Sequence, residues 1–141
     1  MAPGVTDPRD GPLAGRTVLA VFAHPDDESL ACGGTLRRLA ALGARTVLIC
    51  ASHGELGANA SDTGGPLRDL RAAELTDAAA ILRISTVWLL DLPDGSLRWT
   101  GHSAICASIA AAVRRFEPDV VLTFGEDGLY WHPDQIGRAH V

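Results

Sequence analysis

The stretch TVLAVFAHPDDE, Thr17 to Glu28, decides the fold, because an apolar run passes directly into a cluster of reactive polar side chains. The run over residues 17–23 has the length and composition of a buried parallel strand. Small and apolar residues then recur at helical spacing from Leu36 to Gly43. A buried strand followed at once by a helix is the first unit of an α/β fold.

The same alternation continues along the chain. We expect further strands over residues 46–52, 86–93 and 119–124, and helices around residues 75–82 and 105–116. Right-handed crossovers between these strands predict an α/β, Rossmann-like three-layer sandwich with a mostly parallel sheet. Numbered along the chain, the strands are expected in the order 3-2-1-4.

Composition limits the kind of protein. A chain of 141 residues with 47% hydrophobic residues has enough material for one packed domain, and its net charge of −5 argues against a nucleic-acid partner. Three cysteines without CxxC spacing favour thiols in a reducing compartment. There is no secretory h-region and no run of membrane-spanning length, so we expect a cytoplasmic protein without a membrane partner. The oligomeric state is not predicted.

The domain is expected to occupy residues 16–135. Residues 1–15 are rich in Pro, Gly and Asp and are expected to form a flexible leader. Residues 53–66 are glycine-rich and polar, which predicts a loop that is long for a plain connection. Long loops in compact domains are often functional.

The first motif places His24 beside Asp26, Asp27 and Glu28. Imidazole nitrogen and carboxylate oxygen suit Zn²⁺ or another first-row divalent metal, and a cation would relieve the repulsion between the acids. An acid that does not bind the metal can serve as general base. For an isolated acidic cluster, capping of the following helix is the simpler interpretation.

A second HPD segment favours the metal interpretation. It begins at His132, shortly after the strand expected over residues 119–124, whereas His24 directly follows the strand over residues 17–23. In a sheet of order 3-2-1-4 these two strands are neighbours, and ligands bind at the carboxyl ends of strands where the winding reverses. We therefore expect both HPD segments to line one crevice.

The segments VFAHPDDESLACGGTL and DVVLTFGEDGLYWHPD resemble the two signatures of the LmbE/PIG-L family of zinc-dependent N-acetylglucosaminyl deacetylases. RAAEL, beginning at Arg71, and LPDG, beginning at Leu92, resemble its weaker middle motifs. The resemblance covers residues 17–134. It implies a hydrolase that removes the N-acetyl group from an N-acetylglucosamine-type sugar or glycoconjugate by attack of a zinc-bound water.

The same resemblance implies roles for the motif residues. His24 and Asp27 would be metal ligands, and Asp26 would be the general base. His132 would stabilise the oxyanion or protonate the leaving amine. A base, an acid and a Lewis acid are what amide hydrolysis needs.

Four further residues are expected to contact substrate. The resemblance implies that Tyr130 helps to hold the oxyanion and that Arg71 contacts the sugar or its aglycone, with Asp94 less specifically matched. Glu55 is expected to line the site because its loop follows the strand next to the first one. Without the resemblance, Arg71 would be interpreted as a surface ion pair.

The chain departs from the family pattern at Gln135, where the second signature has a histidine that is the third metal ligand. Glutamine is a poor zinc ligand, and two protein ligands rarely hold zinc, so we expect this chain to be metal-deficient and impaired. The family also continues with a further helix and strand. Because IGRAHV matches one frame of a common sequencing adapter, we expect residues 136–141 to be non-native and Gln135 to replace a native histidine.

Two other functions remain open on the sequence alone. One is a divalent-metal amidase or esterase that acts on a non-sugar substrate. The other is a non-catalytic, Mg²⁺-binding flavodoxin-like or receiver-like domain. A receiver would use Asp91 after the third strand together with a lysine, and the chain contains no lysine.

Overall fold

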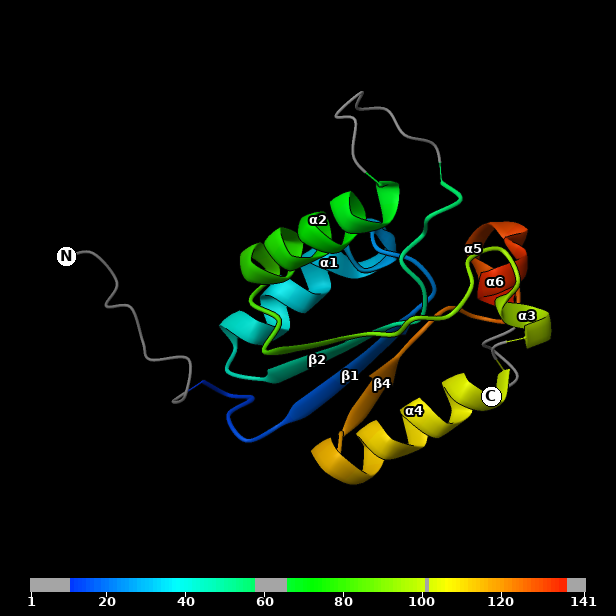
Figure 1. Ribbon diagram of the computed structural model, residues 1–141. Coiled ribbons are helices and arrows are strands. Elements are labelled where there is room, and N and C mark those ends of the chain that lie inside the picture. The colour runs from blue at the N-terminus through cyan, green and yellow to red at the C-terminus, as the bar shows by residue number, and fades with distance from the viewer. Residues whose placement is uncertain (1–10, 58–65, 101, 137–141) are drawn as a thin grey trace.

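A parallel four-stranded sheet forms the middle layer of the structure (Figure 1). It is a computed structural model that describes residues 11–57, 66–100 and 102–136, so residues 1–10 of the expected leader and 137–141 of the expected tail lie outside it. The sheet order is β3-β2-β1-β4, and every pair is parallel. The predicted strand order and α/β class are therefore confirmed.

The two central strands are longer than the two at the edges. β1 (Thr17–Phe22) and β2 (Arg45–Cys50) pair over six residues. β3 (Thr86–Leu89) pairs only with β2, and β4 (Val120–Leu122) pairs only with β1. Both edge strands end before the sequence predicts, because an edge strand has a ladder partner on one side only.

Helices cover both faces of the sheet. α1 (Asp27–Ala41) and α2 (Leu67–Leu82) lie on one face, and α4 (His102–Phe116) lies on the other (Figure 1). Successive residues of a strand point to opposite faces. Phe22 of β1 accordingly belongs to the cluster with residues of α1 and α2, whereas Val21 packs in the cluster with residues of α4. The three layers predicted from the sequence are present.

Three single-turn helices were not predicted: α3 (Leu97–Thr100), α5 (Gly128–Trp131) and α6 (Pro133–Ile136). Four residues are too few to show a 3.6-residue period, so hydrophobic patterning cannot reveal them. They gather beside the carboxyl ends of the strands (Figure 1). Among the described residues, no helix combines the length and the apolar character that crossing a bilayer requires.

Candidate active site

The first HPD segment forms the turn from β1 into α1. Asp27 begins the helix, and its Oδ2 accepts hydrogen bonds from the backbone N–H groups of Ala23 (3.1 Å) and His24 (3.0 Å). Glu28 Oε2 accepts the N–H of Asp26 at 3.1 Å, so an acid does help to cap the helix. Asp26 itself makes no side-chain capping bond, which leaves its carboxylate available to the crevice.

Asp26 has an unusual backbone conformation. Its φ is 123° and its ψ is −30°, although it is not glycine. An L-residue in such a region costs on the order of 1–3 kcal/mol and persists only where its surroundings enforce it. Strained residues of this kind cluster at functional sites.

The second HPD segment lies against the first. The rings of His24 and His132 meet edge to face, with 4.8 Å between their centroids. Gln135 Nε2 donates a 2.8 Å hydrogen bond to Asp27 Oδ1. The crevice expected between the two segments is therefore present, and position 135 faces the acid expected to be its fellow ligand.

Asp134 joins the two HPD segments to the loop after β3. It is 1% exposed, and its carboxylate accepts hydrogen bonds from the N–H groups of Gly95 (2.8 Å) and Leu97 (3.0 Å). His24 Nε2 lies 3.0 Å from Asp134 Oδ2 and 3.0 Å from Asp94 Oδ1. One buried carboxylate thus connects three segments that are far apart in the sequence.

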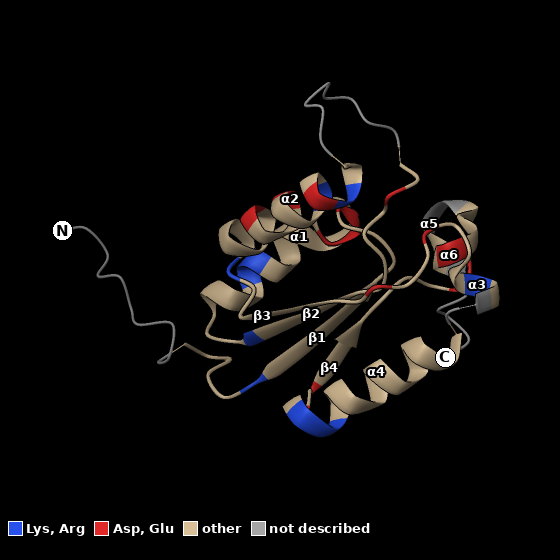
Figure 2. Cartoon of the chain, viewed as in Figure 1, with Lys and Arg blue, Asp and Glu red and all other residues tan. Residues whose placement is uncertain are grey.

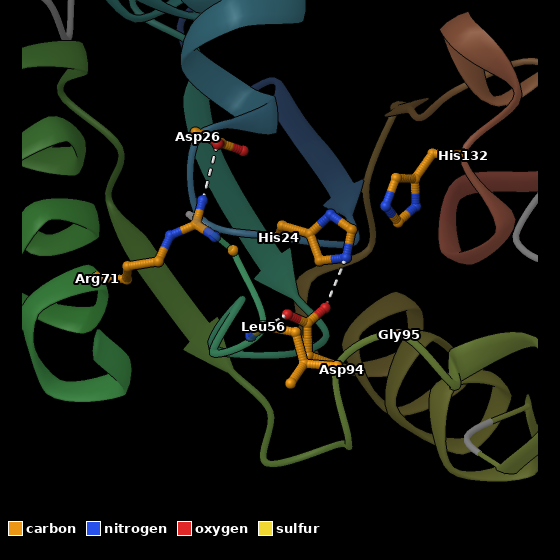
Figure 3. Close-up of a pocket in the computed structure, with 8 residues that line it drawn as sticks. His24, Asp26, Leu56, Arg71, Asp94, Gly95 and His132 are labelled. Atoms are coloured by element: carbon orange, nitrogen blue, oxygen red, sulfur yellow. Dashed lines mark hydrogen bonds and ion pairs between the residues drawn. The ribbon is translucent and has the colours of Figure 1, made fainter. Parts of the chain in front are cut away.

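A pocket of about 230 Å³ opens where these segments meet (Figure 3). Asp26 and His132 lie on either side of His24 in this view, and Asp94 lies below it. In Figure 2 several segments coloured red for Asp and Glu lie near the carboxyl ends of the strands. The pocket is lined by His24, Asp26, Leu56, Gly57, Arg71, Asp94, Gly95 and His132.

Residues 19–137 match the profile of the PIG-L family, described as GlcNAc-PI de-N-acetylase. The chain belongs to the PIG-L family. The matched range contains both HPD segments that meet in the crevice, so the resemblance noted in the sequence is confirmed.

Relatives of known name share this fold. A 1D-myo-inositol 2-acetamido-2-deoxy-alpha-D-glucopyranoside deacetylase from Kineococcus radiotolerans is 34% identical over 89% of this chain and 43% of its own length. The solved structure of N,N'-diacetylchitobiose deacetylase from Pyrococcus horikoshii matches with a TM-score of 0.74 and 25% identity, over 96% of this chain and 50% of that one.

A third relative has a different named activity. The structure of GalB, the 4-carboxy-2-hydroxymuconate hydratase from Pseudomonas putida, matches with a TM-score of 0.71 and 28% identity, over 89% of this chain and 54% of its own. The chain thus spans about half the length of the relatives it matches.

Donors for a metal ion converge in this PIG-L crevice. His24, His132 and Asp134 each offer an atom within 4.8 Å of the others, and imidazole with carboxylate suits a first-row divalent cation. His24 and Asp27 also fit the ligand set that the resemblance implies. Position 135 fits less well, because the Gln135 amide directs an N–H toward Asp27 and an N–H group cannot coordinate a cation.

Burial and neighbouring charges shift the acid–base groups of the crevice in opposite directions. Burial alone would lower the pKa of His24, but Asp134, Asp27 and Asp94 raise it above the usual value. Burial alone would raise the pKa of Asp134, but hydrogen bonds from His24, Gly95 and Leu97 hold it below the usual value. The two groups therefore favour the ion pair.

The acids of the first segment behave differently. Burial raises the pKa of Asp26, and the nearby guanidinium of Arg71 offsets only part of that effect. Burial also raises the pKa of Asp27, against the hydrogen bonds from His24 and Ala23. A carboxylate with a raised pKa is better suited to accept a proton than an ordinary aspartate.

Some of the residues expected to contact substrate line the pocket, and others do not. Asp94 and Arg71 line the pocket, whereas Glu55 does not: its Oε1 accepts the N–H of Asp94 at 3.1 Å, and it fixes the loop rather than facing the cavity. The side chain of Tyr130 lies outside the described part. Trp131 is next to Tyr130 in the sequence, but it is 74% exposed and lies outside the pocket lining.

Sequence reasoning missed several residues that shape the pocket. Leu56, Gly57 and Gly95 line it, although none carries reactive chemistry. The only signal was their place in the glycine-rich loop after β2 and in the PDG turn after β3. The contacts of Asp134 were missed as well, and their only signal was the repetition of HPD itself.

Proposed function

We propose that this chain contributes the active site of a metal-dependent N-deacetylase that acts on an N-acetylglucosamine-type sugar or glycoconjugate. The observation that carries the proposal is the pocket in which Asp26 and His132 flank His24, in a chain of the PIG-L family. The names of two relatives specify N-acetylated amino sugars, which supports this substrate class.

Hydrolysis of the acetamide forms a bond between a water oxygen and the acetyl carbonyl carbon, and breaks the carbon–nitrogen bond. Asp26 takes a proton from the attacking water, a role that its partly exposed carboxylate at the pocket wall supports. His132 donates a proton to the departing nitrogen from the other side of His24. Acetate and the free amine are the products, and Asp94 contacts the sugar.

His24 and Asp27, with the side chain at position 135, would hold Zn²⁺ or another first-row divalent cation. Such a cation supplies Lewis acidity for the carbonyl and lowers the pKa of water. Because Gln135 presents an amide N–H to Asp27, this chain is proposed to bind the cation weakly and to be impaired.

Acetate release and metal content test the proposal together. The chain and its Gln135→His variant are incubated with zinc, dialysed, and assayed with N-acetylglucosamine and N,N'-diacetylchitobiose. We expect Gln135→His to retain roughly one zinc ion per chain, as a catalytic site with three protein ligands does, and to release acetate. Adding Asp26→Asn should then lower the rate by about 10²- to 10⁴-fold while zinc is retained.

Asp77→Asn is the matched control, because it makes the same change at an exposed acid of α2 and should leave the rate unchanged. The proposal is wrong if Gln135→His binds no zinc and Asp26→Asn leaves acetate release unchanged. Faster release from non-sugar acetamides would favour the amidase alternative. The receiver alternative has little support, since Asp91 is 74% exposed and pairs with Arg68 at the surface.

A further inference from the structure

The guanidinium of Arg71 is fixed by protein groups on two loops. Its Nη1 donates to the carbonyl oxygen of Gly54 at 2.9 Å. Its Nη2 donates to the carbonyl oxygen of Pro25 and, at 2.7 Å, to Asp26 Oδ2. The side chain is only 15% exposed, so this charge depends on these partners for compensation. Arg71 therefore connects α2 to the loops that follow β1 and β2.

Two glycines make room for this guanidinium. A Cβ at Gly54 would lie 2.2 Å from Arg71 Nη1, and a Cβ at Gly57 would lie 2.8 Å from the same atom. Gly54 also has a φ of 64°, which disfavours a side chain there. The loop after β2 thus forms a slot that fits the guanidinium in one position.

The slot places the guanidinium of Arg71 against Asp26, the strained residue of the crevice. One Nη2 atom binds the Pro25 carbonyl immediately before Asp26 and also the carboxylate of Asp26. It therefore contacts both the backbone and the side chain of the segment where φ reaches 123°. Contacts to the backbone just before a strained residue and to its side chain help such a conformation to persist.

We propose that Arg71 is a positioning residue: it holds Asp26 in its strained conformation so that the carboxylate faces the pocket. This role rests on the proposed function, in which Asp26 is the general base. These hydrogen bonds give Arg71 a role in addition to its place in the lining of the pocket. Loss of the arginine would misplace the base.

The kinetic test uses Arg71→Lys and Gly54→Ala, each in the Gln135→His chain with N-acetylglucosamine as substrate. Lysine keeps the charge but cannot reproduce the forked contacts. Each change should lower kcat on the order of a hundredfold, the effect of a misplaced catalytic group. For Gly54→Ala, KM should stay within about twofold, because an interaction that acts only on the chemical step leaves ground-state binding intact.

Gly15→Ala is the matched control for Gly54→Ala. Gly15 has a φ of 80°, but a Cβ there would meet nothing within 4 Å, so the variant carries the backbone strain without the collision. Its kcat should match that of the parent. The proposal is overturned if Arg71→Lys raises KM and leaves kcat unchanged, or if Gly54→Ala behaves like Gly15→Ala.

Crystal structures of the Arg71→Lys and Gly54→Ala variants provide a readout that does not need activity. We expect Asp26 to leave the positive-φ region and its carboxylate to turn away from the pocket in both. An unchanged Asp26 in both variants overturns the positioning role. If the parent releases no acetate, the proposed function fails, whereas these structures still decide whether Arg71 holds Asp26.

Discussion

Replacing Asp134 by Asn tests whether this buried carboxylate holds the crevice together. Asp134 is 1% exposed and accepts hydrogen bonds from Gly95 and Leu97, with His24 Nε2 at 3.0 Å. Asparagine keeps one acceptor oxygen and replaces the other with an N–H₂ group, so one of the two backbone N–H groups faces a donor. A buried donor without an acceptor costs about 1–3 kcal/mol. We therefore expect Asp134→Asn to lower the free energy of unfolding by about 2 kcal/mol, with the charge-assisted contact to His24 also weakened.

Urea denaturation followed by far-ultraviolet circular dichroism, with EDTA present to remove metal, measures this change. A loss of about 2 kcal/mol would shift the midpoint by roughly 1 M urea with an unchanged m-value. Asp91→Asn is the matched control, because that side chain is 74% exposed, and its effect should stay within about 0.5 kcal/mol. If Asp134→Asn falls in the same range as this control, the carboxylate does not stabilise the junction and the reasoning is refuted.

Two further predictions concern the sheet. Leu48 is 0% exposed in β2, so Leu48→Ala should lower the free energy of unfolding by about 2–5 kcal/mol. Ile81→Ala, at a residue 74% exposed on α2, should change it by at most about 0.5 kcal/mol. Hydrogen bonds from the Thr17 N–H and from Arg16 hold the pKa of Asp119 below its usual value. The stability that these hydrogen bonds add is present when the pH is above the usual pKa of aspartate. It is lost as the pH falls through the lowered pKa of Asp119. The urea midpoints of the unchanged chain and of Asp119→Asn should therefore differ most at neutral pH and converge as the pH falls. A difference between the midpoints that grows on acidification would contradict this prediction.

The sheet could be predicted because its signals are local. The apolar runs from Thr17 and from Thr46 identify the central strands, and the doubly wound α/β pattern then supplies the strand order. That order places His24 and His132 at one crevice before any contact is known. The lengths of the edge strands were overestimated, because the length of such a strand depends on its ladder partner rather than on its own residues.

Contacts between loops were not predictable in the same way. Asp134 accepts hydrogen bonds from the backbone N–H groups of Gly95 and Leu97. Every residue except proline has such a donor, so the sequence pattern does not show which ones Asp134 binds. The hydrogen bond from Arg71 to the Gly54 carbonyl was not predicted, because it depends on the path of a loop with no periodicity. Such contacts form only when loops that are distant in the sequence come together in the fold, and residue types alone do not reveal them.

The narrow slot around Arg71 also has an evolutionary consequence. Gly54 is favoured by its own backbone angle, whereas the tightest restriction at Gly57 is the guanidinium 2.8 Å from where its Cβ would lie. Positions 57 and 71 should therefore covary among homologues. Lineages that keep the arginine are expected to keep glycine at 57, and larger residues should arise there only after the arginine has been replaced by a shorter side chain.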